Sequence, residues 1–147
     1  MSLKNRLLED MKTAMRERDT IRKNTVQMVR SAVLQVEKDN HVTLDDDGII
    51  EVVAKEVKMR KESLSSYENS GRQDLIDDLN SEISVLLAYL PTQLTEAEVE
   101  EIVSKAITDT KATSARDMGK IMQAVMPQIK GRSDGKVVNQ IVKKLLG

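Results

Sequence analysis

The sequence predicts an all-α protein in two parts, a four-helix N-terminal unit followed by a three-helix C-terminal unit. Apolar residues recur at helical spacing along most of the 147-residue chain. Aromatic side chains are almost absent, since the chain has two tyrosines and no Phe or Trp. A core restricted to Leu, Ile, Val, Met and Ala suits helices that pack ridge into groove better than a β-sandwich.

The N-terminal unit is expected to cover residues 1–91. Its helices are predicted over residues 3–18, from Asp19 or Thr20 to Asn40, from Thr43 to the Asn69–Gly71 stop, and through Leu75–Leu90. Three consecutive aspartates, residues 45–47, oppose the positive end of the third helix and can cap its amides. Pro91 ends the fourth helix, because proline lacks a backbone donor and restricts the preceding residue.

The C-terminal unit, residues 92–147, follows the linker Pro91–Leu94. Thr95 with Glu98 has the spacing of a capping box, and Ser114 with Asp117 repeats it before a second helix. A last helix is expected to start at Ser133 or Asp134. No internal repeat or low-complexity tract interrupts this order.

The sequence offers no catalytic residues and no metal or cofactor site. His41 is the one histidine, and no serine, cysteine or second histidine accompanies it to form a relay. The aspartates at 45–47 are contiguous, whereas a calcium loop of the EF-hand type needs alternating ligands and a closing glutamate. Phosphate-loop, dinucleotide-binding and zinc-protease motifs are absent as well, so no small-molecule substrate is evident.

Targeting signals and membrane spans are also missing from the pattern. The segment MSLKNRLLEDMK contains acidic residues and lacks the apolar run of a secretory signal. No stretch approaches the roughly 18 apolar residues that cross a bilayer. We therefore expect a cytoplasmic protein without a membrane partner.

Two helical stripes allow more than one interpretation. Met118, Met122 and Met126 recur every four residues, which fits core packing and, less often, an adaptable groove for a partner helix. The segment KEVKMRKES has three lysines along one helix, with Glu56 and Arg60 at the spacing of an ion pair. A solvated face is favoured there over a contact surface.

The strongest charge bias lies near the C-terminus. After Thr110 the sequence has eight Lys/Arg and two Asp. Within this region the segment KGRSDG, residues 130–135, separates two apolar helical stripes and is expected to be a turn and helix cap. A helix N-terminus with basic neighbours can also hold a phosphate, although Ser133 or Asp134 would occupy the same amides. The residues alone leave both interpretations open.

Several segments resemble the YqeY-like family. They are YLPTQLTEAEVEEIV, DMGKIMQAVMPQIKGRSDGKVVNQIV, VQMVRSAV and KEVKMRKES, and together they span almost the full chain in one register. The C-terminal part is also similar to the tail domain of the B subunit of the glutamine-dependent tRNA amidotransferase. This resemblance implies an all-α, two-part fold and a tRNA-related role.

The resemblance implies a non-catalytic module that binds tRNA or a structured RNA. Lys120, Lys130, Arg132 and Lys136 would contact phosphates, and Gly131 would let the backbone turn and approach closely. The amidotransferase is a carbon–nitrogen ligase with glutamine as amide donor, but its Ser–Ser–Lys glutaminase and its magnesium- and ATP-binding body have no counterpart in this chain. The alternative is a protein-interaction module that docks a protein partner or assists the amidotransferase.

Overall fold

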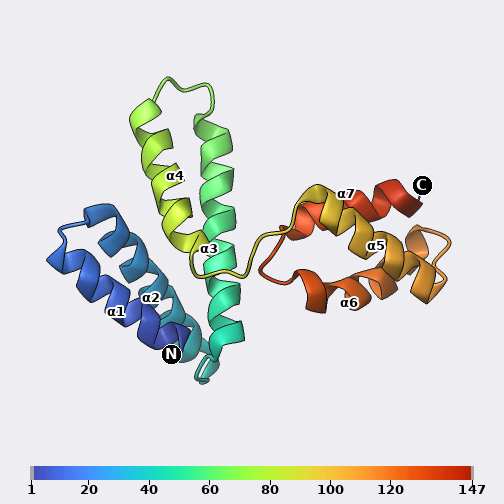
Figure 1. The fold of residues 1–147 in the computed structure, drawn as a ribbon, viewed down its shortest axis with the longest axis horizontal. Coiled ribbons are helices and arrows are strands. Elements are labelled where there is room, and N and C mark those ends of the chain that lie inside the picture. Colours follow the sequence, from blue (N-terminus) through green and yellow to red (C-terminus); the bar gives the residue numbers. More distant parts are fainter. Residues whose placement is uncertain (1, 147) are drawn as a thin grey trace. The chain divides into compact units, whose positions relative to one another are not determined.

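The computed structural model describes residues 2–146, and all regular secondary structure in that range is helical (Figure 1). The all-α prediction is confirmed. The helices are α1 (Leu3–Arg16), α2 (Thr20–Asn40), α3 (Asp46–Tyr67), α4 (Gln73–Leu87), α5 (Glu96–Thr110), α6 (Met118–Ile129) and α7 (Gly135–Leu146), and a 3₁₀ turn, η1 (Ala115–Asp117), precedes α6. None of these described helices is long and apolar enough to cross a membrane.

The chain forms two compact units that meet in sequence between Leu90 and Pro91. Each unit has its own buried aliphatic cluster. Unit 1 contains α1–α4 as two helical hairpins, and unit 2 contains α5–α7 with η1.

The caps explain most of the helix starts. The side chains of Asp19 and Asp45 each accept a backbone N–H of the first turn, at the start of α2 and α3 respectively. Thr95 and Glu98 form the predicted capping box at the start of α5. Local side-chain acceptors therefore fix these boundaries, as the sequence indicates.

Two local predictions are wrong. Ser114 makes no side-chain cap bond, and the Asp117 carboxylate instead accepts the Thr113 N–H at 3.0 Å. The chain forms η1 at this point, so the expected capping geometry before α6 does not arise. The fourth helix ends at Leu87 and residues 88–90 form a turn, because Tyr89 and Leu90 donate to carbonyls only three residues back.

Buried polar side chains join the helices of unit 1. Arg60 is 6% exposed and contacts Glu56 on its own helix and Glu82 on α4, both at 3.3 Å. The predicted ion pair between Glu56 and Arg60 is thus present, on a buried face. Because a buried guanidinium must be paired, this contact fixes how α3 and α4 pack.

A second polar cluster ties α1 and α2 to the end of α4. The buried Tyr89 hydroxyl donates to the Asp10 carboxylate, and Arg22 lies 3.5 Å from Asp10. The Arg6 guanidinium lies 4.5 Å above the Tyr89 ring and donates to the Ala88 carbonyl. Burial, followed by the hydrogen bond to Asp10, raises the pKa of Tyr89 well above its ordinary range. The phenol therefore stays protonated and holds the end of α4.

Candidate nucleic-acid interface

The KGRSDG segment is the turn between α6 and α7. Gly131 adopts a positive φ of 73°, a conformation that favours glycine. The N–H groups of Arg132 and Ser133 donate to the Ile129 carbonyl at 2.8 and 3.2 Å, which closes the C-terminal end of α6. Asp134 then accepts the Lys136 N–H at 3.0 Å at the start of α7. The prediction of a turn and helix cap is confirmed.

The linker that precedes α5 holds this turn in place. The Leu94 N–H donates to the Arg132 carbonyl at 2.8 Å, and the Gln93 amide donates to the Gly131 carbonyl at 2.7 Å. The Arg132 Nε donates to the Thr92 carbonyl at 3.0 Å. Residues about 40 positions apart in sequence thus form one hydrogen-bonded strap within unit 2.

The candidate basic residues differ in what their side chains do. Arg132 is half-buried, and its guanidinium is engaged by the Thr92 and Gln128 carbonyls. Lys120, Lys130 and Lys136 are exposed. Arg132 therefore acts chiefly as a clamp for the turn, and the three lysines are the side chains that solvent or a ligand reaches.

The candidates also fall into two places. Lys130, Gly131, Arg132 and Lys136 belong to the α6–α7 turn or directly flank it. Lys120 is in the first turn of α6, ten residues before Lys130, which is about 15 Å along the helix axis. A ligand that contacts all of them must extend along α6.

Acidic groups beside these residues carry perturbed pKa values. Hydrogen bonds from the Thr95 N–H and hydroxyl lower the pKa of Glu98, and the charge of Arg132 contributes. The Thr113 N–H lowers the pKa of Asp117, and Lys120 contributes as well. Both carboxylates are therefore ionised at neutral pH and cap structure rather than take part in chemistry.

The remaining basic residues of unit 2 are exposed, and the methionine stripe is mostly covered. Lys111, Arg116, Lys143 and Lys144 all reach solvent. Met118 and Met122 pack against the aliphatic cluster of unit 2, and Met126 is 40% exposed. Core packing thus accounts for two of the three methionines.

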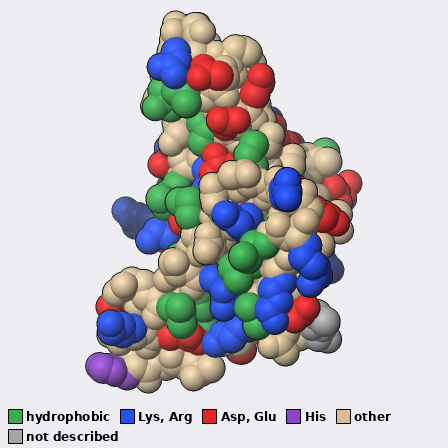
Figure 2. Space-filling model, turned by 90° about the vertical axis from the view of Figure 1, so that its left-hand side faces the viewer, with side chains coloured by type: hydrophobic (Ala, Val, Ile, Leu, Met, Phe, Trp, Pro, Cys, Tyr) green, Lys and Arg blue, Asp and Glu red, His purple; other side chains and the backbone are tan. Residues whose placement is uncertain are grey.

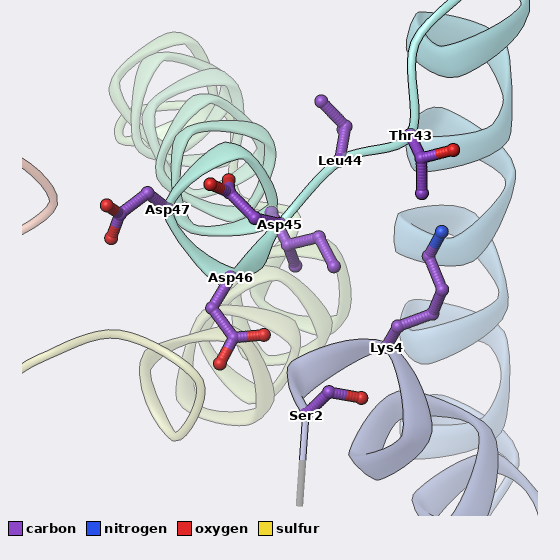
Figure 3. Close-up of a pocket in the computed structure, with 8 residues that line it drawn as sticks. Ser2, Lys4, Thr43, Leu44, Asp45, Asp46 and Asp47 are labelled. Carbon is purple, nitrogen blue, oxygen red and sulfur yellow. The ribbon is translucent and has the colours of Figure 1, made fainter.

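Unit 1 has an acidic depression of about 530 Å³ at the start of α3, lined by residues from α1 and the α2–α3 loop (Figure 3). Its polar groups already have structural partners. Asp45 caps Gly48 at 2.9 Å, and Asp46 accepts the Leu3 N–H at 3.0 Å. Over residues 2–146, no group of three His, Cys, Asp or Glu residues is arranged to hold a metal ion. His41 is exposed and forms the left-handed C-cap of α2.

Comparison with known proteins finds relatives of two kinds. The altered inheritance of mitochondria protein 41 of Pyrenophora tritici-repentis is 27% identical over 97% of this chain and 80% of its own length. The protein of the same name from Kluyveromyces lactis is 34% identical over 71% of this chain and 58% of its own length. A glutamyl-tRNA(Gln) amidotransferase polypeptide of Sulfurisphaera tokodaii, one of the components of that enzyme, is 28% identical over 84% of this chain, which corresponds to 19% of its own length.

The cytoplasmic location expected from the sequence is contradicted by these names. The relatives that cover most of the chain are named as mitochondrial proteins. The expectation was wrong because the lack of an apolar segment excludes a membrane span or a secretory signal and does not determine a compartment.

The family comparison agrees with the resemblance seen in the sequence. The family described as Yqey-like protein matches residues 4–146, from the second residue of α1 to the last residue of α7. The match includes both helical units, and the similarity to the amidotransferase polypeptide also reaches into unit 1, since unit 2 is much shorter than the matched region. The chain therefore belongs to the Yqey-like protein family and is a helical module related to a small part of a tRNA amidotransferase.

Proposed function

We propose that this chain is a non-catalytic helical module that binds tRNA or another structured RNA through unit 2. The observation that carries the proposal is the similarity over 84% of the chain to a polypeptide named for glutamyl-tRNA(Gln). The similar region is 19% of that polypeptide, which suits an accessory part better than a complete enzyme.

The surface of unit 2 supports contact with phosphates. Lys120, Lys130 and Lys136 are exposed, and Gly131 allows the main chain to turn closely between them. The two tyrosines lie in unit 1, so unit 2 has no aromatic side chain on which an unpaired base could stack. Recognition by unit 2 is therefore expected to depend on RNA shape and phosphate charge.

The first test is fluorescence-anisotropy binding of bulk tRNA across a salt series, with duplex DNA as the competing ligand. The wild-type chain should prefer tRNA, and its affinity should fall as salt rises because bound lysines release counterions. Replacing Lys120, Lys130 and Lys136 together with Gln should weaken binding about tenfold or more and reduce the salt slope by about three. Arg132 is left intact, because its loss would release the turn.

The matched control replaces the three exposed α3 lysines, Lys55, Lys58 and Lys61, with Gln. It removes the same charge and should leave binding within about twofold. Absence of tRNA binding at low salt would overturn the proposal and shift the weight to a protein partner. An equal loss in both triple variants would assign the effect to net charge and would also overturn it.

A further inference from the structure

Charge is segregated within unit 1. Residues 1–40 have nine Lys/Arg and six Asp/Glu, whereas residues 41–90 have five Lys/Arg and eleven Asp/Glu. The α1–α2 hairpin is therefore basic and the α3–α4 hairpin is acidic. A polyanion that approached unit 1 would be attracted to the first hairpin and repelled by the second.

Two helical stripes border the contact between α1 and α2. On α1 the spacing places four residues on one side, and on α2 it places five. The contact itself is marked by Lys4, which lies 2.6 Å from Glu37, and by Arg30, which donates to the Met11 sulfur at 3.3 Å. We call the two stripes together the seam surface: Lys4, Leu8, Lys12 and Met15 on α1, and Lys23, Gln27, Arg30, Leu34 and Lys38 on α2.

The seam surface has five cations and no carboxylate of its own. Lys4, Lys12 and Lys38 are exposed, and Lys23 and Arg30 are half-buried. Figure 2 looks onto the side of the molecule where α1 and α2 lie, and Lys and Arg side chains gather there around hydrophobic ones. Glu9 lies 3.7 Å from Lys12, but both side chains are about half exposed, and such a surface pair is weak enough for a phosphate to displace.

The cations form a ladder rather than a compact spot. Lys4 and Lys12 are eight residues apart, or about 12 Å along α1. Lys23 and Lys38 are fifteen residues apart, or about 22 Å along α2. An extended phosphate backbone can contact charges spread over this length, whereas the energy of a protein interface is usually concentrated in a few anchors.

The composition of the seam surface also favours nucleic acid over an acidic protein. Protein hot spots are rich in Trp, Tyr and Arg in well-packed pockets. The seam surface has no aromatic residue, and its most exposed apolar side chains are Met15 at 56% and Leu34 at 62%, on different helices. The similarity to the tRNA amidotransferase polypeptide reaches into unit 1, so the RNA-related region is not confined to unit 2.

We propose that the seam surface is a second phosphate-binding site for the same RNA, so that both units of the chain contact it. This inference rests on the proposed function and adds a site to it. Two linked weak sites bind one ligand more tightly than either site alone, because the second contact forms at a high effective concentration. The proposal also explains why α1 and α2 keep cations along one edge when α3 and α4 do not.

The test compares three triple variants of the full chain by tRNA anisotropy over a salt series. The seam variant replaces Lys12, Lys23 and Lys38 with Gln and leaves Lys4 and Arg30, which have structural contacts. Glutamine keeps the helix propensity near that of lysine. The unit 2 variant and the α3 control are those described above, and circular dichroism and thermal unfolding verify that each variant is folded.

The seam variant should bind tRNA about tenfold or more weakly, with a salt slope reduced by about two to three, and the α3 control should stay within about twofold. If the seam variant binds as the wild type while the unit 2 variant is weakened, the seam site is wrong and the proposed function stands. If the wild type does not bind tRNA at all, both fail together. Replacing Met15 and Leu34 with Ser should change binding less than about twofold; a larger loss would indicate an apolar docking face and would overturn the phosphate site.

Discussion

Unit 1 and unit 2 are both small helical bodies with aliphatic cores, but they are fastened in different ways. In unit 1, side chains such as Arg60 and Tyr89 turn inward and join helices through charged partners. In unit 2, the turn after α6 is tied to the linker largely through main-chain carbonyls of Thr92, Gly131 and Arg132. Main-chain fastening lets unit 2 keep its lysines at the surface, whereas unit 1 uses part of its charge to hold itself together.

The chain provides a way to observe the two units separately. Its two tyrosines, Tyr67 and Tyr89, both lie in unit 1, and it has no Trp or Phe. Tyrosine fluorescence therefore reports on unit 1, and far-ultraviolet circular dichroism reports on helices of both units. A variant that acts on one unit can be assigned by which signal moves.

The largest expected effect is that of Arg60→Ala. Removing this buried guanidinium leaves Glu56 and Glu82 without their partner, and breaking a buried pair in this way typically costs about 3–5 kcal/mol. Urea unfolding followed by tyrosine fluorescence should show the loss in unit 1. The exposed neighbour Lys58→Ala should change stability by less than about 0.5 kcal/mol. A similar small change for both variants would mean that the inward charges of unit 1 do not hold it together.

Arg132→Ala should have a smaller effect, and in the other unit. The guanidinium donates to the Thr92 and Gln128 carbonyls in a half-exposed setting, so about 1–2 kcal/mol is expected from two modest hydrogen bonds. The change should appear in circular dichroism and leave the tyrosine midpoint in place. An equal shift of both signals would show that the two units unfold together, and the comparison between them would then fail.

The sequence was sufficient for most of the fold, because caps and breakers act locally. Asp19, Asp45 and Thr95 mark helix starts through bonds to residues three positions away, and such spacing is visible in the sequence. The boundary near Pro91 and the turn at residues 130–135 are marked in the same way. The Ser114 prediction failed because the same spacing also fits a 3₁₀ turn, and only the structure distinguishes the two.

The roles of individual site residues were less predictable. Arg132 and Lys130 look alike in the sequence, yet the Arg132 guanidinium is engaged by a carbonyl 40 residues away. Bonds at that separation leave no local pattern. The seam surface was missed for a different reason: its charge is diluted by the acidic α3–α4 hairpin when unit 1 is counted as a whole, and a count for each hairpin would have revealed it.

The smallest expected effect is a dependence on acid that belongs to unit 2. The Thr95 N–H and hydroxyl lower the pKa of Glu98 below its ordinary value of 4.5. A carboxyl whose pKa is depressed in the folded state stabilises it above the unfolded pKa, and that contribution is lost as pH falls through the folded value. Between neutral pH and about pH 4.5 the capping box is therefore intact, and below this range protonation removes it.

Glu98→Gln tests this sign directly. Glutamine can also close a capping box but does not titrate, so the variant should lose less stability than the wild type between about pH 5 and pH 3, as measured by circular dichroism at several urea concentrations. The exposed neighbour Glu101→Gln, which takes no part in the box, should retain the wild-type acid dependence. An unchanged acid dependence in Glu98→Gln would show that the cap adds no charge-dependent stability. Unit 2 would then depend on its strap and its aliphatic core alone.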